Sequence, residues 1–181
     1  YKIDSINQVP INNKVGLSFE LVLKNILRQD PDIIFIGEIR DKFSLDIALQ
    51  ASLTGHLVLA SIHSSSSVET ITRLIDLKAD PFLISTTLKA VMAQRLVLAH
   101  CKSCENGCKK CNFTKFYDRT SIAEILKVDE QISSLIFNKA SFNELKEYLK
   151  NINFKTMLDD GKQKVKDGLT TLEEVYKVVN F

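Results

Sequence analysis

Two acidic residues follow a short apolar run in the first quarter of the chain. Residues 33–36 read IIFI, and Glu38 and Asp41 come directly after them. A run of this length is too short for a helix and favours a strand buried on both faces, as in parallel sheets. Ligands of such sheets bind beyond the carboxyl ends of the strands. There, carboxylates can hold magnesium or orient a water beside a phosphate, unless they are only solvated charges.

Two histidines bracket the next apolar run. Residues 57–62 (LVLASI) predict a second strand, with His56 before it and His63 after it. Between the strands, residues 44–53 repeat apolar side chains at helical spacing. Strand, helix and strand form a βαβ unit with parallel strands. Glu38 and His63 would then meet at one sheet edge, where they suit chemistry on a phosphoryl group. The alternative is that each histidine is a satisfied core residue.

The four cysteines form one cluster in the sequence, as Cys101, Cys104, Cys108 and Cys111. Paired CxxC units suit one tetrahedral zinc ion held by four thiolates. A pair of disulfides or four free thiols are the alternatives. No secretory signal pattern precedes the cluster, so a reducing cytosol is expected, and this disfavours disulfides. A closed site of four thiolates holds a loop together and leaves no open position for catalysis.

Length and composition bound the possible functions. The chain has 181 residues, of which 45% are apolar and 25% charged, with a net charge of +2. A charge this small argues against a large nucleic-acid interface. No apolar run reaches the roughly 20 residues that span a bilayer. The sequence begins at Tyr1 without a methionine, and we expect it to be a fragment of a longer protein.

Capping residues and apolar spacing predict the remaining elements as helices. Asp80 should cap one of them, with Pro81 at its first position and Arg95 near its end. After the cysteines, capping-box patterns predict three or four short amphipathic helices. Their expected N-caps are Asp129, Ser141 and Thr170, and the helices before the cysteines are expected over residues 19–29, 68–77 and 80–92.

Several motifs together resemble a known family. Residues 27–41 (LRQDPDIIFIGEIRD) look like the Walker B region of the ATPases that power type II secretion and type IV pilus assembly. Residues 53–63 (LTGHLVLASIH) resemble their "His box". The tetracysteine stretch points to the secretion and pilus-assembly branch, because the pilus-retraction branch typically lacks it. The likeness continues through residues 72–76, 93–97, 119–120 and 168–178, so it covers nearly the whole chain.

The resemblance implies an α/β fold with a partial RecA-like P-loop NTPase core, a parallel sheet flanked by helices, over residues 1–100. A zinc-binding stretch would follow over 101–118, and a small helical subdomain over 119–181. The implied cofactors are ATP, Mg²⁺ and Zn²⁺. By resemblance, Glu38 supports magnesium, and His63 approaches the γ-phosphate with His56 nearby. The other residues implied on the nucleotide side are Asp41, Arg40 and Arg73, the arginines contacting phosphate or a neighbouring subunit.

Three features depart from the family pattern. A Walker A loop, GxxxxGK[ST], cradles the phosphates in such ATPases, and none of the six glycines here opens that pattern. In the family, this loop and an acidic "Asp box" precede the region seen here. The residues around the second histidine read SIHSS instead of the family's common TLHTN. Before Arg119, where the family is rich in glycine, the sequence has Phe116, Tyr117 and Asp118.

The function implied is the C-terminal part of a hexameric cytoplasmic ATPase at the inner membrane. Hydrolysis would drive pseudopilus or pilus assembly for type II secretion, type IV pili or DNA uptake. The fragment alone is expected to be inactive. Expected partners are the inner-membrane platform and cytoplasmic adaptor proteins, without direct nucleic-acid contact. Two alternatives remain open: an oligomerisation module, and a zinc-containing nucleic-acid module using the lysines and Phe113 of the cysteine stretch.

Overall fold

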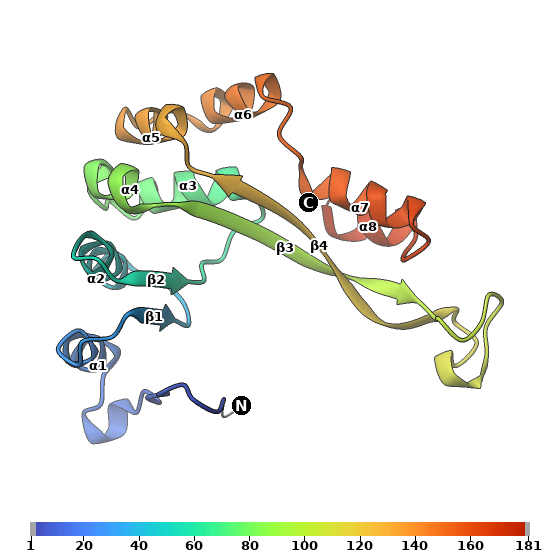
Figure 1. Cartoon of the computed structure of the whole chain (residues 1–181), viewed down its shortest axis with the longest axis horizontal. Coiled ribbons are helices and arrows are strands. Elements are labelled where there is room, and N and C mark those ends of the chain that lie inside the picture. The colour runs from blue at the N-terminus through green and yellow to red at the C-terminus, as the bar shows by residue number, and fades with distance from the viewer. Residues whose placement is uncertain (1–2, 180–181) are drawn as a thin grey trace.

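The computed structural model describes residues 3–179, so the outermost residues of the first and last predicted domains, 1–2 and 180–181, lie outside the described residues. The fold is α/β (Figure 1). A parallel pair of strands, β1 (Ile33–Ile36) and β2 (Leu57–Ala60), is followed by a long antiparallel hairpin of β3 (Ala90–His100) and β4 (Phe116–Lys127). The cysteine stretch forms the far end of this hairpin (Figure 1).

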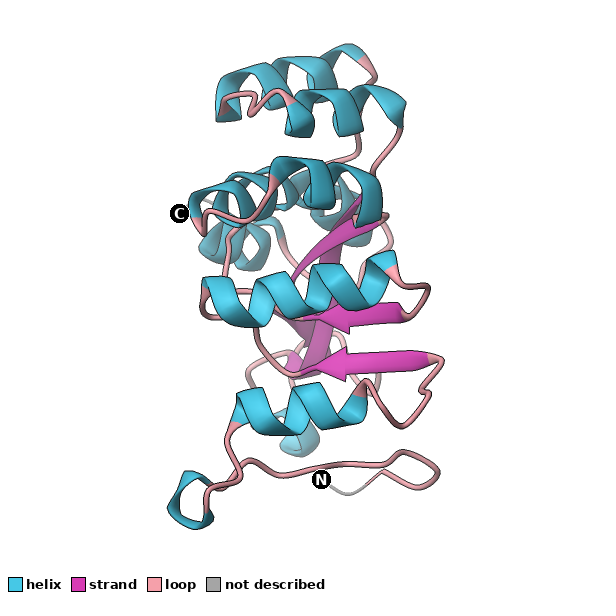
Figure 2. Cartoon of the chain, turned by 90° about the vertical axis from the view of Figure 1, so that its left-hand side faces the viewer, coloured by secondary structure: helices cyan, strands magenta, loops and turns pink. Residues whose placement is uncertain are grey.

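The predicted βαβ unit is confirmed. Strand β1 leads into α2 (Lys42–Leu53), and α2 leads into β2, which pairs with β1 in parallel. Helix α1 (Phe19–Ile26), capped by Ser18, lies with α2 on one face of the two strands (Figure 2). Apolar side chains from these elements build the larger core, which also includes residues of α3 (Ser67–Asp76).

The prediction that the first strand is buried on both faces is wrong for this structure. Ile34 and Ile36 face the helices and are 4% and 2% exposed. Ile33 and Phe35 point the other way and are 60% and 71% exposed. Within residues 3–179, β1 and β2 form a two-stranded sheet, and the apolar residues of its second face remain in contact with solvent. The continuous apolar run therefore supplies one face of a core and one uncovered face.

The helix predicted from Asp80 to Met92 is wrong beyond Thr87. Helix α4 (Pro81–Thr87) is capped by Asp80 as expected, but the chain then extends as β3. Arg95 consequently lies in a strand and not at a helix end. Ladder hydrogen bonds with β4 override the helical spacing of the apolar residues, since the register runs unbroken from Ala90–Lys127 to Leu98–Arg119.

The helices predicted after the cysteines are present, although a strand precedes them. Helices α5 (Glu130–Phe137) and α6 (Phe142–Asn151) join the larger core, capped by Asp129 and Ser141 as predicted. Helices α7 (Met157–Lys166) and α8 (Leu172–Val179) pack on the hairpin around a second core. The expected cap Thr170 is wrong by one residue. The Thr171 hydroxyl accepts from the Glu174 N–H, whereas the Thr170 hydroxyl donates to the Leu98 carbonyl.

Among residues 3–179, no helix combines the length and the apolar character needed to cross a membrane.

Candidate functional site

The loops that follow β1 and β2 are joined to each other. The Ile39 N–H donates to the Ser61 carbonyl at 2.8 Å, and the Ser61 hydroxyl donates to the Gly37 carbonyl. These bonds continue the parallel pairing beyond the last strand residues. Both carboxyl ends therefore open at one edge of the sheet, and the residues that follow them are held at a fixed distance.

Glu38 and His63 meet at this edge, as the sequence predicts. His63 Nε2 lies 2.9 Å from Glu38 Oε1, and the Arg40 guanidinium donates to the other carboxylate oxygen, with Nε at 2.6 Å. The hydrogen bond from Arg40 holds the pKa of Glu38 below its usual value, and the nearby charges of His63 and Arg73 act in the same direction. The Glu38 side chain is 21% exposed, so its ionised oxygens stand at the rim of the sheet edge.

Asp41 has a structural partner. As the N-cap of α2, its Oδ1 accepts from the backbone N–H and from the hydroxyl of Ser44, each at 2.8 Å. These bonds, with the backbone one the larger cause, lower the pKa of Asp41. The carboxylate lies beside Glu38 in the sequence, but one of its oxygens is committed to beginning the helix.

His56 is not brought to this edge. It precedes β2, so it lies at the opposite end of the strand from His63. Its Nδ1 is 2.9 Å from the Ala51 carbonyl and 3.2 Å from the Thr54 hydroxyl, both at the end of α2. Because β1 and β2 are in parallel register with Ile33 opposite Leu57, the length of the strands separates His56 from Glu38.

The oxygen ligands at the edge suit magnesium by their chemistry. Magnesium prefers carboxylate oxygens and usually keeps several waters. Glu38 has two ionised oxygens there, one in contact with His63 and the other with Arg40, and Oδ1 of Asp41 is bonded to Ser44. Arg40 and Arg73 carry positive charge suited to phosphate oxygens. Glu38, His63, Arg40 and Arg73 thus gather on one side, and His56 lies outside the group.

The four cysteine sulfurs form a compact group at the hairpin end. All four Sγ atoms lie within 4.8 Å of one another, and all four cysteines are free of disulfides. The Sγ–Sγ distances are 3.6 Å for Cys104–Cys111, 3.9 Å for Cys108–Cys111 and 4.0 Å for Cys101–Cys108. A tetrahedral zinc with Zn–S bonds of about 2.3 Å requires S···S separations of about 3.8 Å. The donor set and its spacing therefore fit zinc.

Backbone groups also favour a thiolate in this cluster. The Cys108 N–H donates to Cys111 Sγ at 3.2 Å and is the largest of several contacts that lower the pKa of that thiol to about 6, whereas burial first and the neighbouring cysteines next raise the pKa of Cys104 to about 12. Gly107, with φ of +101°, permits the tight turn: a Cβ there would lie 2.9 Å from the Phe113 carbonyl oxygen. The backbone of the loop thus brings the four sulfurs together.

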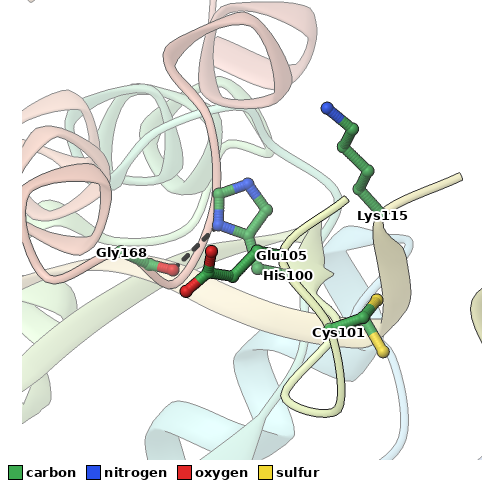
Figure 3. Close-up of a pocket in the computed structure, with 6 residues that line it drawn as sticks. His100, Cys101, Glu105, Lys115 and Gly168 are labelled. Atoms are coloured by element: carbon green, nitrogen blue, oxygen red, sulfur yellow. Dashed lines mark hydrogen bonds between the residues drawn. The ribbon is translucent and has the colours of Figure 1, made fainter. Parts of the chain in front are cut away.

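A shallow cavity of about 320 Å³ lies beside the cysteine cluster (Figure 3). His100 Nδ1 donates to the Gly168 carbonyl at 2.8 Å along one wall, and the His100 ring stacks on Phe116. This cavity is far along the hairpin from the strand ends that carry Glu38. The residues that line it are His100, Cys101, Cys104, Glu105, Lys115 and Gly168.

Two glutamates that the sequence did not single out, Glu124 and Glu174, are buried, and Glu124 bridges separate elements. Glu124, on β4, is 7% exposed and accepts hydrogen bonds from Ser67 and Met157. The sequence carries a signal for the burial of Glu124, which is the alternation of residues along the strand. The residues that share its inward face are Ile122, Glu124 and Leu126. A glutamate at an inward position of a strand needs buried donors. Recognising β4 as a strand would have identified it.

Comparisons with known proteins agree with the motifs. A family model described as type II/IV secretion system protein matches residues 1–177. The type II secretion system protein HxcR of Pseudomonas aeruginosa is 41% identical over 187 residues, covering 98% of this chain and 40% of HxcR. The type IV pilus assembly ATPase PilB of Thermus thermophilus is 38% identical, covering 97% of this chain and 23% of PilB.

A solved structure shares the architecture. The crystal structure of the pilus retraction motor PilT with bound ADP superposes with a TM-score of 0.70 at 29% identity, covering 89% of this chain and 43% of PilT. The predicted α/β fold of an ATPase core is confirmed by this likeness. The chain spans less than half the length of each of these three relatives.

Proposed function

Because the chain belongs to the family of type II/IV secretion system proteins, we propose that it forms the magnesium side and the γ-phosphate side of an ATPase site. One observation carries this proposal: Glu38 stands at the carboxyl end of β1 with His63 2.9 Å away and Arg40 bonded to it. This is the edge at which open parallel sheets bind ligands.

Each residue has a distinct role in this proposal. Glu38 holds magnesium, since the hydrogen bond from Arg40 lowers the pKa of its carboxyl group and magnesium prefers carboxylate oxygens. Bound magnesium supplies neutralisation of the charge that develops on the phosphates during transfer. His63 contacts the γ-phosphate end, and Arg40 and Arg73 contact phosphate or a neighbouring subunit. Asp41 positions the loop by capping α2 through its Oδ1.

The rest of the enzyme lies in a longer protein under this proposal. The sequence contains no GxxxxGK[ST] loop, and the chain spans 40% of HxcR. Without a phosphate cradle, the 181-residue chain binds nucleotide through too few contacts to hydrolyse it. The uncovered apolar face of β1 and β2, with Phe35 71% exposed, supports a missing portion of the sheet domain.

In the cell, the complete protein is proposed to act as a homohexameric cytoplasmic ATPase against the inner membrane. Hydrolysis would drive assembly of a pseudopilus or pilus, for type II secretion, type IV pili or DNA uptake. This assignment is supported by the names of the relatives, which include a type II secretion protein and a pilus assembly ATPase. Its partners would be the membrane platform and cytoplasmic adaptors of that machinery.

The cysteine cluster is proposed to hold one structural zinc. Cys101, Cys104, Cys108 and Cys111 supply four sulfurs and leave no open position, so the ion would fix the hairpin end and take no part in hydrolysis.

The test of the site compares charge-removing variants in the full-length protein. Glu38→Gln keeps the shape of the side chain but removes the charge that magnesium needs. We expect turnover to fall at least about a hundredfold, or roughly 2.7 kcal/mol of barrier, while nucleotide affinity changes little. His63→Ala should also lower turnover with binding retained. His56→Ala should lower it less, because His56 bonds the end of α2.

Glu20→Gln is the matched control. Glu20 is an exposed acid on α1 that forms a salt bridge with Lys24, so this variant makes the same chemical change away from the sheet edge. Turnover of the control should equal that of the wild type. If Glu38→Gln stays within about threefold of the wild type, which is below one 1.4 kcal/mol step, Glu38 is a solvated charge and the proposed site is wrong.

A further inference from the structure

Glu124 is a buried carboxylate that holds the first residues of two helices. Its Oε1 accepts from the backbone N–H and from the hydroxyl of Ser67, both at 2.7 Å. Its Oε2 accepts from the Met157 N–H at 3.0 Å. Ser67 begins α3 and Met157 begins α7. The first N–H groups of a helix lack partners inside the helix, and the positive end of the helix dipole favours a carboxylate. Glu124 therefore ties the hairpin to both helices at once.

The same face of the hairpin also contacts the beginning of the segment that leads into α3. Arg95 lies two residues from Ala93, the register partner of Glu124, so both side chains project from one face. The Arg95 Nη2 donates to the Ser64 carbonyl at 3.1 Å. The serine loop, defined here as residues 64–67, is thus held at its beginning by Arg95 and at its end by Glu124.

The serine loop directly follows His63 in the sequence. The His63 side chain is 84% exposed, so packing gives its ring little orientation. The direction of the ring depends on its contact with Glu38 and on the backbone at both sides of His63, which the sheet edge holds at Ser61. Arg95 and Glu124 hold the backbone that follows His63, so the hairpin contributes to how the imidazole meets the carboxylate.

We propose that Glu124 is a positioning residue that sets His63 against Glu38. It acts through Ser67 and the serine loop and does not touch the site itself. The contact with Met157, a residue of the second core, extends this link from the serine loop to α7. The effect on ATP hydrolysis rests on the proposed function, whereas the effect on the His63 ring does not.

The test uses Glu124→Gln in the 181-residue chain and nuclear magnetic resonance of the histidine rings. Glutamine keeps the shape but replaces one acceptor oxygen with an NH₂ donor, which must face the donors of Ser67 or Met157. The sequence has three histidines, so each ring signal can be assigned by single substitution. Glu38→Gln supplies the reference signal for a His63 ring without its carboxylate partner.

We expect the His63 ring signals of Glu124→Gln to move toward their positions in Glu38→Gln. The signals of His56 and His100 should stay in place, since neither ring contacts the serine loop. His63 signals that remain at the wild-type positions in a folded Glu124→Gln chain would overturn the proposal.

Thr170→Val is the matched control. The Thr170 hydroxyl is buried and donates to the Leu98 carbonyl of β3 at 2.7 Å, so its loss also removes a buried hydrogen bond to the hairpin, away from the serine loop. This variant should melt at a lower temperature with unchanged His63 signals. Equal displacement of the His63 signals by both variants would mean general loosening and would refute a positioning role. If Glu124→Gln does not fold, Ser67→Ala removes only the hydroxyl contact and takes its place.

A second readout uses the full-length protein. Glu124→Gln should lower kcat for ATP about tenfold or more, with KM within about twofold, because a misplaced group affects the transition state and leaves nucleotide binding elsewhere intact. If the wild-type protein hydrolyses ATP and Glu124→Gln has the same kcat, this result counts against the proposal. Absence of hydrolysis in the wild-type protein would refute the proposed function and leave the histidine signals to decide on positioning.

Discussion

Gly161 and Val175 offer a measurable test of how the two last helices pack. Gly161 lies inside α7, where a Cβ would stand 2.5 Å from Val175 Cγ1 and 3.1 Å from Cγ2 of α8. Val175 is 0% exposed and cannot move into solvent. Unbonded carbon atoms prefer about 3.5–4.0 Å, so an added methyl must shift its neighbour by about 1 Å.

We expect Gly161→Ala to lower the free energy of unfolding by up to about 2 kcal/mol. Overpacking costs roughly 1–3 kcal/mol, and the better helix propensity of alanine offsets about 1 kcal/mol. Val175→Ala alone removes two buried methyl groups, with a cost of about 1.5–3 kcal/mol including the cavity. In the double variant the new methyl fills part of that cavity, so the combined loss should fall short of the sum by at least about 1 kcal/mol.

The assay is urea unfolding of the wild type, both single variants and the double variant. Val178→Ala is the control partner: Val178 packs against the same core, but the atoms nearest to the added Cβ all belong to Val175. Its combination with Gly161→Ala should be additive within about 0.5 kcal/mol. A Gly161–Val175 coupling that is equally small would refute close contact of the two helices at this point.

Two other predictions concern the cysteine cluster and the first turn of α7. Protein prepared without chelator should contain about one zinc per chain, and Cys104→Ser should lower that ratio in elemental analysis while β1 and β2 stay folded; four freely reactive wild-type thiols would contradict it. Thr156→Ala should destabilise the protein by about 1 kcal/mol at neutral pH through loss of the helix cap. The Thr156 hydroxyl lowers the pKa of Asp159 below its usual 3.8, so this contribution is complete above pH 4 and is lost as the pH falls through the lowered pKa. Thermal unfolding between pH 2 and pH 7 should show that the difference in melting temperature between Thr156→Ala and the wild type becomes smaller in acid. A difference that does not change with pH would exclude a contribution from the Thr156–Asp159 hydrogen bond.

The sequence predicts the βαβ unit well because its signals are local. The apolar run of β1, the spacing of α2 and the acid after the strand all lie within a short segment, and parallel pairing follows from the connecting helix. Glu38 and His63 could be placed together for the same reason. The cysteine spacing likewise predicts a cluster that the structure forms.

The hairpin could not be predicted in this way. The sequence of β3 carries apolar residues that fit a helical repeat, and its partner β4 lies beyond the cysteine stretch. Pairing across such a gap is decided by tertiary contacts and not by local spacing. With β4 unrecognised, Glu124 could not be assigned to an inward position. The exposed second face of β1 was missed because an apolar run shows what a strand can bury, not what is available to cover it.

The hairpin is long, so a small rotation at one end corresponds to a large displacement at the other. Strand β3 has 11 residues, so at about 3.4 Å per residue the cysteine cluster lies about 30 Å or more from the base near Ala90. With a strand of this length, a rotation of about 10° at the base would displace the cysteine cluster by about 5 Å. His100 rests on the α7–α8 connection, where its N–H donates to the Leu169 carbonyl at 2.9 Å. This contact ties the far end of β3 to the α7–α8 connection, so a tilt of the hairpin at its base would have to carry α7 and α8 with it.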